Sequence, residues 1–283
     1  MTIKTVGVVG CGLMGGGITQ VAAQAGYYTI VREASDELLK KGIGRIEKIL
    51  YGAVQNGKLD EADKKAALGR ITGTTDLNGL HGCDIVIEAV TENPDVKKEV
   101  FQELGNVTPD HAILASNTSS ISITELATVT NRPNQVVGLH FFNPVPIMSL
   151  IEIVVGLDTD DETIATARAF GESLGKKVIV AKDTPGFIVN YLLIPYLLDA
   201  IRLVESDTAS PEDIDSGMVL GCSHPMGPLK LLDFIGLDTT LFIADVLYDA
   251  FRTDRYTAPA LLRKMVAAGY MGRKSGRGFY EYQ

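Results

Sequence analysis

One histidine and one glutamate have the types and placing needed for general acid–base catalysis. His140 ends the apolar run 135–139, and Glu152 lies twelve residues later within the next apolar run, 150–155. Both runs are predicted strands. The histidine side chain exchanges a proton near neutral pH, while a carboxylate partner fixes its tautomer and stabilises the imidazolium. The sequence therefore predicts an acid–base pair at a strand end.

The other histidines are poorer candidates for this role. His81 and His111 lie in polar turns, and His224 follows an expected helix end directly before Pro225. A histidine considered alone is more often structural than catalytic, so His140 needs support from the rest of the chain.

A glycine-rich turn near the N-terminus supplies that support. The buried-strand run 6–9 leads into Gly10-Cys11-Gly12-Leu13-Met14-Gly15, which matches G-x-G-x-x-G, and a helix-like stretch follows at 18–25. In such a turn the first glycine permits the tight bend, the second lets the backbone approach a pyrophosphate, and the third lets the helix pack closely on the strand. The helix N-terminus then offers N–H groups to phosphates.

An acidic residue stands at the expected distance beyond this turn. Glu33 follows Gly15 by eighteen residues, at the end of a second apolar run. It is placed to accept hydrogen bonds from a ribose diol, and an acid there repels a 2′-phosphate. The turn and the acid together predict an NAD site, with the neighbouring Arg32 leaving NADP as the alternative.

Composition limits the classes of function. The chain has 283 residues, 46% hydrophobic residues and a formal charge of −9, and its pI is near 5.0. An acidic chain of this kind is not expected to bind nucleic acid. No apolar stretch is long enough to span a bilayer, and the first strand begins too early to leave room for a signal peptide. Three scattered cysteines without metal-ligand spacing fit a reducing, cytoplasmic compartment.

The first 180 residues alternate strand-like and helix-like segments. This pattern predicts an α/β, Rossmann-type, doubly wound and mostly parallel sheet with helices on both faces. The expected strands are Val6–Val9, Tyr28–Val31, Asp84–Glu88, Ala112–Ala115, Gln135–Leu139, Leu150–Val155 and Lys177–Ala181.

Several helices are also marked. Residues 35–55 and 60–68 form a predicted helical hairpin inserted after the second expected strand, which serves either substrate binding or packing alone. Ser122-x-x-Glu125 and Thr159-x-x-Glu162 are typical capping boxes. Ser210-Pro211 is typical of a helix start.

The pattern changes near residue 186. Beyond it the apolar-periodic segments are Val189–Val204, Pro211–Leu220, Leu237–Asp249 and Ala258–Ala268, with no convincing strand before the last residues. We expect a nucleotide-binding domain over 1–185 and an all-α domain over 186–283. Its helices are apolar on more than one face, which favours a homodimer or higher homo-oligomer formed through this domain; the alternative is contact with the first domain.

Longer motifs make the chain resemble a known family. They are Ser116-Asn117-Thr118-Ser119-Ser120, His140-Phe141-Phe142-Asn143-Pro144, Asp183-Thr184-Pro185-Gly186-Phe187, His224-Pro225-Met226-Gly227-Pro228 and Gly272-Arg273-Lys274-Ser275-Gly276. In this order they resemble short-chain L-3-hydroxyacyl-CoA dehydrogenases of the bacterial 3-hydroxybutyryl-CoA dehydrogenase type, over essentially the whole chain.

The resemblance implies a role for each matching position. His140 would be the acid/base, Glu152 its orienting partner, and Ser119 and Asn190 would bind substrate oxygens. Asn143 would support the histidine turn or contact the substrate thioester. The cofactor contacts beyond the glycine turn would be Glu33, Glu92, Lys97, Asn117, Ser119 and Lys274. The alternatives are that Ser119 caps a helix, that Asn190 is a buried helix-start residue, and that Glu152 is satisfied by backbone.

Two departures from the family concern the substrate. Ser149 stands where relatives often have lysine, and the hairpin stretch Gln55-Asn56-Gly57-Lys58 supplies charge for CoA phosphates only through Lys58.

The resemblance implies an NAD-dependent dehydrogenase that interconverts 3-hydroxybutyryl-CoA and acetoacetyl-CoA, within fatty acid and butyrate metabolism. The alternatives are a related dehydrogenase of a CoA-free hydroxy or sugar acid, and a cofactor-binding protein without catalysis.

Overall fold

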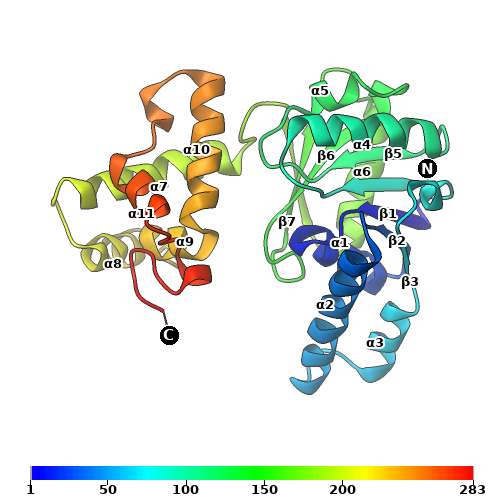
Figure 1. Cartoon of the computed structure of the whole chain (residues 1–283), viewed down its shortest axis with the longest axis horizontal. Coiled ribbons are helices and arrows are strands. Elements are labelled where there is room, and N and C mark those ends of the chain that lie inside the picture. Colours follow the sequence, from blue (N-terminus) through cyan, green and yellow to red (C-terminus); the bar gives the residue numbers. More distant parts are fainter. Residues whose placement is uncertain (1, 283) are drawn as a thin grey trace. The chain divides into compact units, whose positions relative to one another are not determined.

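The computed structural model describes residues 2–282. They divide into two compact units, one ending at Thr184 and the other beginning at Pro185. The first contains the sheet and the second is helical (Figure 1).

The sheet of the first unit has eight strands in the order β3-β2-β1-β4-β5-β6-β7-β8. All neighbouring strands described are parallel except β6 and β7. The strands are β1 (Thr5–Val9), β2 (Tyr28–Arg32), β3 (Ile71–Thr74), β4 (Ile85–Glu88), β5 (Ile113–Ser116), β6 (Val136–Phe141), β7 (Leu150–Val155) and β8 (Lys177–Lys182).

The predicted doubly wound, mostly parallel sheet is therefore confirmed, with one strand added. β3 was not expected, because its sequence, Ile71-Thr72-Gly73-Thr74, has a single large apolar side chain and a glycine. It forms the edge of the sheet, where its residues are half-buried or exposed, so a single large apolar side chain is enough.

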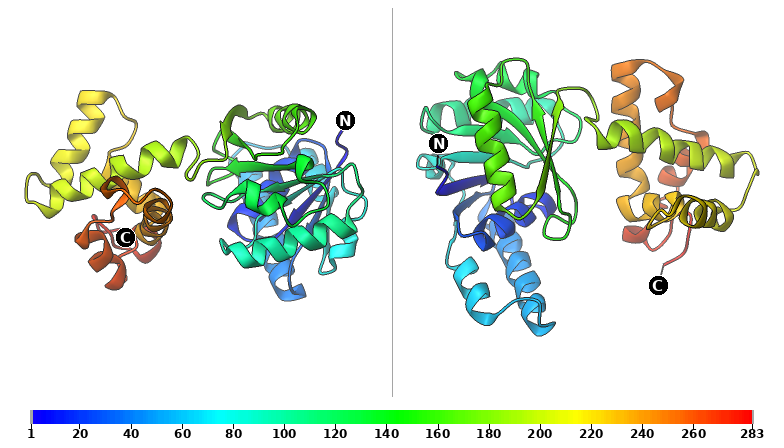
Figure 2. Two further views of the ribbon diagram at one scale, coloured as in Figure 1. Left: turned by 90° about the horizontal axis from the view of Figure 1, so that it is seen from above. Right: turned by 180° about the vertical axis from the view of Figure 1, so that it is seen from behind.

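Helices cover both faces of this sheet. The helix α4 (Pro94–Val107) lies in front of the strands in Figure 1, and the view from behind in Figure 2 brings α6 (Asp161–Ser173) to the front. Alternate residues of the buried strands fit this arrangement: Ile85 and Ile87 belong to the core shared with α1 (Leu13–Gln24) and α6.

The helical hairpin predicted after β2 consists of α2 (Asp36–Gln55) and α3 (Glu61–Leu68), which extend away from the strands in Figure 1. Ser35 caps α2 by accepting a hydrogen bond from the Leu38 amide. The hairpin contacts the glycine turn through Gly42, where an added Cβ would lie 2.6 Å from the Cys11 carbonyl oxygen.

One of the two predicted capping boxes is wrong. Ser122 caps α5 (Ile123–Ala127) as expected, by accepting from the Glu125 amide. At α6 the cap is Asp160, whose carboxylate accepts from the Thr163 amide, whereas the Thr159 hydroxyl donates to the Val136 carbonyl. Aspartate is as good an N-cap residue as serine or threonine. Because Asp160 takes this position, the Thr159 hydroxyl is free to bond to the β6 backbone.

The helical unit contains α7 (Val189–Glu205), α8 (Pro211–Cys222), α9 (Pro228–Ile235), α10 (Leu237–Phe251) and α11 (Ala260–Ala267). Ser210 caps α8 by accepting from the Asp213 amide. Two buried carboxylates secure the C-terminal residues: Asp233 accepts from the Phe279 and Tyr280 amides, and Asp215 accepts from the Tyr280 hydroxyl. Among the described residues, no helix is long and apolar enough to cross a membrane.

The cysteines differ sharply in exposure, which gives a first test of the fold. Cys11 and Cys83 are buried, and burial raises the pKa of the Cys11 thiol to about 11 and that of Cys83 to about 12. Thiolate, the reactive form, is then scarce at both positions at pH 8, whereas Cys222 is exposed. We expect a thiol reagent at pH 8 to label Cys222 quickly, and Cys11 and Cys83 only after unfolding. Fast labelling of the folded Cys222→Ser variant would contradict this arrangement.

Candidate active site

The predicted acid–base pair is formed by the one antiparallel contact in the sheet. β6 and β7 pair so that His140 lies directly opposite Glu152. Residues opposite one another on antiparallel strands point to the same face, which brings the two side chains together. His140 Nδ1 lies 2.7 Å from Glu152 Oε2, and both residues are buried, at 4% and 0% exposure.

This contact fixes which imidazole nitrogen exchanges the proton. A carboxylate accepts only, so Nδ1 carries the hydrogen and Nε2 is the basic nitrogen of the neutral ring. Ser119 Oγ lies 3.2 Å from Nε2, which places the serine hydroxyl as its donor. The Phe142 ring packs against the imidazole with 4.6 Å between ring centres. Three side chains, those of Glu152, Ser119 and Phe142, thus orient His140 at the carboxyl end of β6.

Asn117 and Asn143 lie on either side of the histidine in the chain. The Asn117 side-chain carbonyl accepts from the Phe141 amide at 2.9 Å, which ties the end of β5 to the end of β6. Asn143 is exposed and precedes Pro144 through a cis peptide bond. Asn117 therefore supports the histidine strand directly, and a cofactor contact by the same residue stays a prediction.

The glycine turn has the geometry that a dinucleotide requires. Gly10 has φ +97°, and an added Cβ at Gly15 would lie 1.9 Å from the Gly10 carbonyl oxygen. Above Gly12 the space is open, with no atom within 4 Å of an added Cβ. Helix α1 begins at Leu13 without a side-chain cap, so its first amides are available to an anion. These residues fit a pyrophosphate.

Glu33 lies beside this turn, where its role was predicted. Its carboxylate accepts from the Cys11 amide at 2.7 Å and from the Ala34 amide at 2.9 Å. Each carboxylate oxygen has a second lone pair, which suits a diol. The backbone contacts hold the acid against the glycine turn.

Glu92 and Lys97 lie in a polar network. Lys97 is 1% exposed, and its ammonium contacts Glu88 at 2.6 Å and Glu92 at 3.3 Å. This enclosure favours a role for Lys97 in holding Glu92. Glu88 was not predicted from the sequence, because nothing in the local pattern shows that its side chain meets Lys97.

The remaining predicted residues lie apart from these strand ends in the chain. Lys58 is exposed in the turn between α2 and α3. Asn190 is buried in the first turn of α7, and Lys274 pairs with Asp238 at 2.6 Å; both belong to the helical unit. Their roles toward substrate and cofactor stay predictions.

Comparison with known proteins identifies the family. Residues 5–184 match the model of the 3-hydroxyacyl-CoA dehydrogenase NAD binding domain, and residues 186–282 match that of the C-terminal domain. The chain belongs to the 3-hydroxyacyl-CoA dehydrogenase family. This confirms the predicted resemblance and a nicotinamide cofactor.

Individual relatives cover the whole chain. A 3-hydroxybutyryl-CoA dehydrogenase of Mycobacterium tuberculosis is 51% identical, over 99% of both chains. The human mitochondrial hydroxyacyl-coenzyme A dehydrogenase is 43% identical, over 99% of this chain and 92% of the relative. The crystal structure of (S)-3-hydroxybutyryl-CoA dehydrogenase from Ralstonia eutropha is 48% identical with a TM-score of 0.95, and covers 100% of both chains.

The first prediction from this geometry concerns the imidazole. Replacing His140 by Gln keeps a similar shape but removes the proton acceptor. Turnover should fall by at least about 100-fold, the lower range for loss of general acid–base catalysis. The measurement is kcat on protein shown to be folded by circular dichroism, with His81→Gln, an exposed histidine, as the matched control. Near-normal turnover of His140→Gln would remove His140 from the mechanism.

The second concerns the carboxylate. In Glu152→Gln the imidazolium loses its ionic partner, so the charge that His140 gains on taking the substrate proton is stabilised less. Turnover should fall. The check is kcat of the folded variant, with the exposed Asp158→Asn variant as control. Turnover equal to that of the unmodified enzyme would show that the pair has no role in proton transfer.

Proposed function

We propose that the chain catalyses the reversible oxidation of (S)-3-hydroxybutyryl-CoA to acetoacetyl-CoA. The observation that carries this proposal is the buried His140–Glu152 pair, with the Ser119 hydroxyl at the other imidazole nitrogen. Mere cofactor binding does not need an acid–base pair. Full-length relatives named 3-hydroxybutyryl-CoA dehydrogenases, at about half identity, support the four-carbon CoA thioester as substrate.

The mechanism follows from the proton positions. The glycine turn would hold the pyrophosphate of a nicotinamide dinucleotide, which would supply the acceptor for the hydride that leaves C3 of the substrate. His140 Nε2 takes the C3 hydroxyl proton as the C–H bond breaks, and Glu152 stabilises the resulting imidazolium. When substrate is bound, the Ser119 hydroxyl turns from Nε2, its acceptor in the substrate-free site, to the same oxygen and donates a hydrogen bond to it as charge develops there. In reverse, the imidazolium protonates the alkoxide oxygen.

NAD is the cofactor that Glu33 favours. Its carboxylate is held beside the glycine turn by two backbone amides, where it accepts from a ribose diol and repels a 2′-phosphate. The neighbouring Arg32 side chain makes NADPH the necessary comparison.

A homodimer through the helical unit is part of the proposal. Leu220, Phe234 and Phe242 are large apolar side chains on this unit that are 82%, 42% and 45% exposed in the single chain. Burying such side chains against a second copy would remove them from water. A cytoplasmic location is supported by three free cysteines.

One assay tests reaction, cofactor and substrate together. Purified protein should oxidise NADH rapidly with acetoacetyl-CoA, and far more slowly with free acetoacetate or when NADPH replaces NADH. The thioester should be preferred because the relatives' substrates carry CoA, and NADH because Glu33 repels a 2′-phosphate.

The outcomes separate the alternatives. Protein that binds NADH but does not turn over the thioester would contradict the proposal and point to a CoA-free hydroxy acid. Equal rates with NADPH would contradict the assignment of Glu33.

A further inference from the structure

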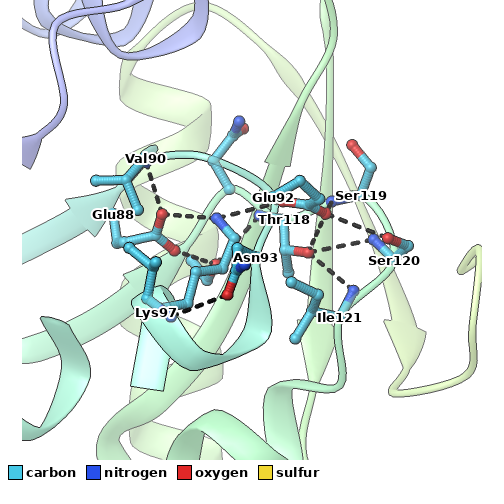
Figure 3. A network of polar contacts seen from close by, with 12 residues as sticks. Glu88, Val90, Glu92, Asn93, Lys97, Thr118, Ser119, Ser120 and Ile121 are labelled. Carbon is cyan, nitrogen blue, oxygen red and sulfur yellow. Dashed lines mark hydrogen bonds and ion pairs between the residues drawn. The ribbon is translucent and has the colours of Figure 1, made fainter. Parts of the chain in front are cut away.

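An ionic cluster, formed by the buried Glu88 and Lys97 and the partly exposed Glu92, lies beside the serine that contacts the catalytic histidine (Figure 3). At its centre is Glu88, the last residue of β4, which is 0% exposed. Its Oε1 accepts from Lys97 Nζ at 2.6 Å and from the Val90 amide at 2.7 Å, and its Oε2 accepts from Ser116 Oγ at 2.7 Å. Both carboxylate oxygens are therefore used inside the protein.

The cluster continues from Lys97 to the serine turn. The Lys97 ammonium lies 3.3 Å from Glu92, and Glu92 Oε1 accepts from Thr118 Oγ1 at 2.5 Å and from the Ser119 amide at 2.9 Å. Figure 3 shows these bonds as one connected set between the end of β4 and the serine turn. A path of hydrogen bonds and one ion pair thus leads from Glu88 to the backbone of Ser119.

The segment that follows β4 also contacts the glycine turn, where the cofactor is expected to bind. Glu88 is in register with Val9 of β1 and with Ser116 of β5. The next residue, Ala89, lies against the glycine turn: a Cβ added to Gly10 would be 2.7 Å from the Ala89 carbonyl oxygen. Glu88 therefore fixes a segment that lies between the two turns that the reaction needs.

Charge makes Glu88 hard to replace. The cluster holds two carboxylates and one ammonium, and burial makes a charge costly unless it is paired. With Glu88 neutral, Glu92 is the one remaining ionic partner of the Lys97 ammonium among residues 2–282, and the ammonium is drawn toward it. Glu92 must then move or share its oxygens differently, and its bond to the Ser119 amide changes with it.

We propose that Glu88 is a positioning residue for the dehydrogenase reaction. Through Lys97 and Glu92 it fixes the backbone of Ser119, and so keeps Ser119 Oγ at its 3.2 Å contact with His140 Nε2. Its effect on turnover depends on Ser119 and rests on the proposed function of that site.

The test is a double-mutant cycle. Glu88→Gln keeps the side-chain shape and removes the charge, and it should lower kcat by about 10- to 100-fold, the range for a hydrogen bond to a charged group. In a Ser119→Ala background the same substitution should cost almost nothing further, because Ser119 is the group through which Glu88 acts. Normal kcat in folded Glu88→Gln, or losses that multiply in the double variant, would overturn the proposal.

Two controls separate positioning from stability. Arg132→Met removes a buried charge at the other end of α4, where the guanidinium donates to the Gly105 and Ala112 carbonyls. It should lower Tm but leave kcat unchanged. Glu103→Gln, an exposed change on α4, should alter neither. If Glu88→Gln does not fold, Glu88→Asp keeps the charge but shortens the side chain that reaches Lys97, and the same cycle with Ser119→Ala decides.

A substrate-free measurement keeps the proposal distinct from the proposed function. The His140 imidazole signals in NMR, assigned by their loss in His140→Gln, should move in Glu88→Gln in the same direction as in Ser119→Ala. They should stay in place in Arg132→Met. Unmoved signals in Glu88→Gln would overturn the role of Glu88 whether or not acetoacetyl-CoA is turned over. An inactive unmodified protein with the expected signal shifts would instead count against the substrate.

Discussion

The reversed direction of β7 is the constraint on which the site depends. In an otherwise parallel sheet, β6 and β7 run antiparallel, so that His140 and Glu152 are direct cross-strand partners. Eleven residues of chain lie between them, yet their side chains meet at 2.7 Å. A parallel β7 would need a crossover connection, and would present its other end to the histidine. The register of the antiparallel strands β6 and β7 thus brings the acid–base pair together.

The rest of the site follows from parallel strands ending at one edge. β1, β2, β4 and β5 present the glycine turn, Glu33, Glu88 and the serine turn at their carboxyl ends, where such sheets bind ligands. Neighbouring ends are then joined by side chains: Glu33 accepts from Cys11, and Asn117 accepts from Phe141. These bonds convert separate turns into one rigid edge, so each reactive group has little freedom left to lose during the reaction.

Much of this could be predicted from the sequence, because the signals are local. The strand–glycine turn–helix pattern, the acid at Glu33 and the apolar runs of β4 to β8 depend on neighbouring residues only, and the sheet follows from them. The edge strand β3 and the Asp160 cap were missed because their signals are weak: one apolar residue in the first case, and two adjacent capping residues in the second. Glu88 was missed for another reason. Its partners, Lys97 and Ser116, come from different elements, and no local pattern brings them together.

The ionic cluster also explains the polar run from Ser116 to Ser120. Three of its four hydroxyls contact an acid: Ser116 donates to Glu88, while Thr118 and Ser120 donate to Glu92. Only the Ser119 hydroxyl faces the imidazole. A run of small hydroxyl residues can satisfy buried carboxylates and still fit at a crowded sheet edge, which larger donors could not do. The hydroxyls on either side of Ser119 thus donate to Glu88 and Glu92, whereas the Ser119 hydroxyl is available to the reacting groups.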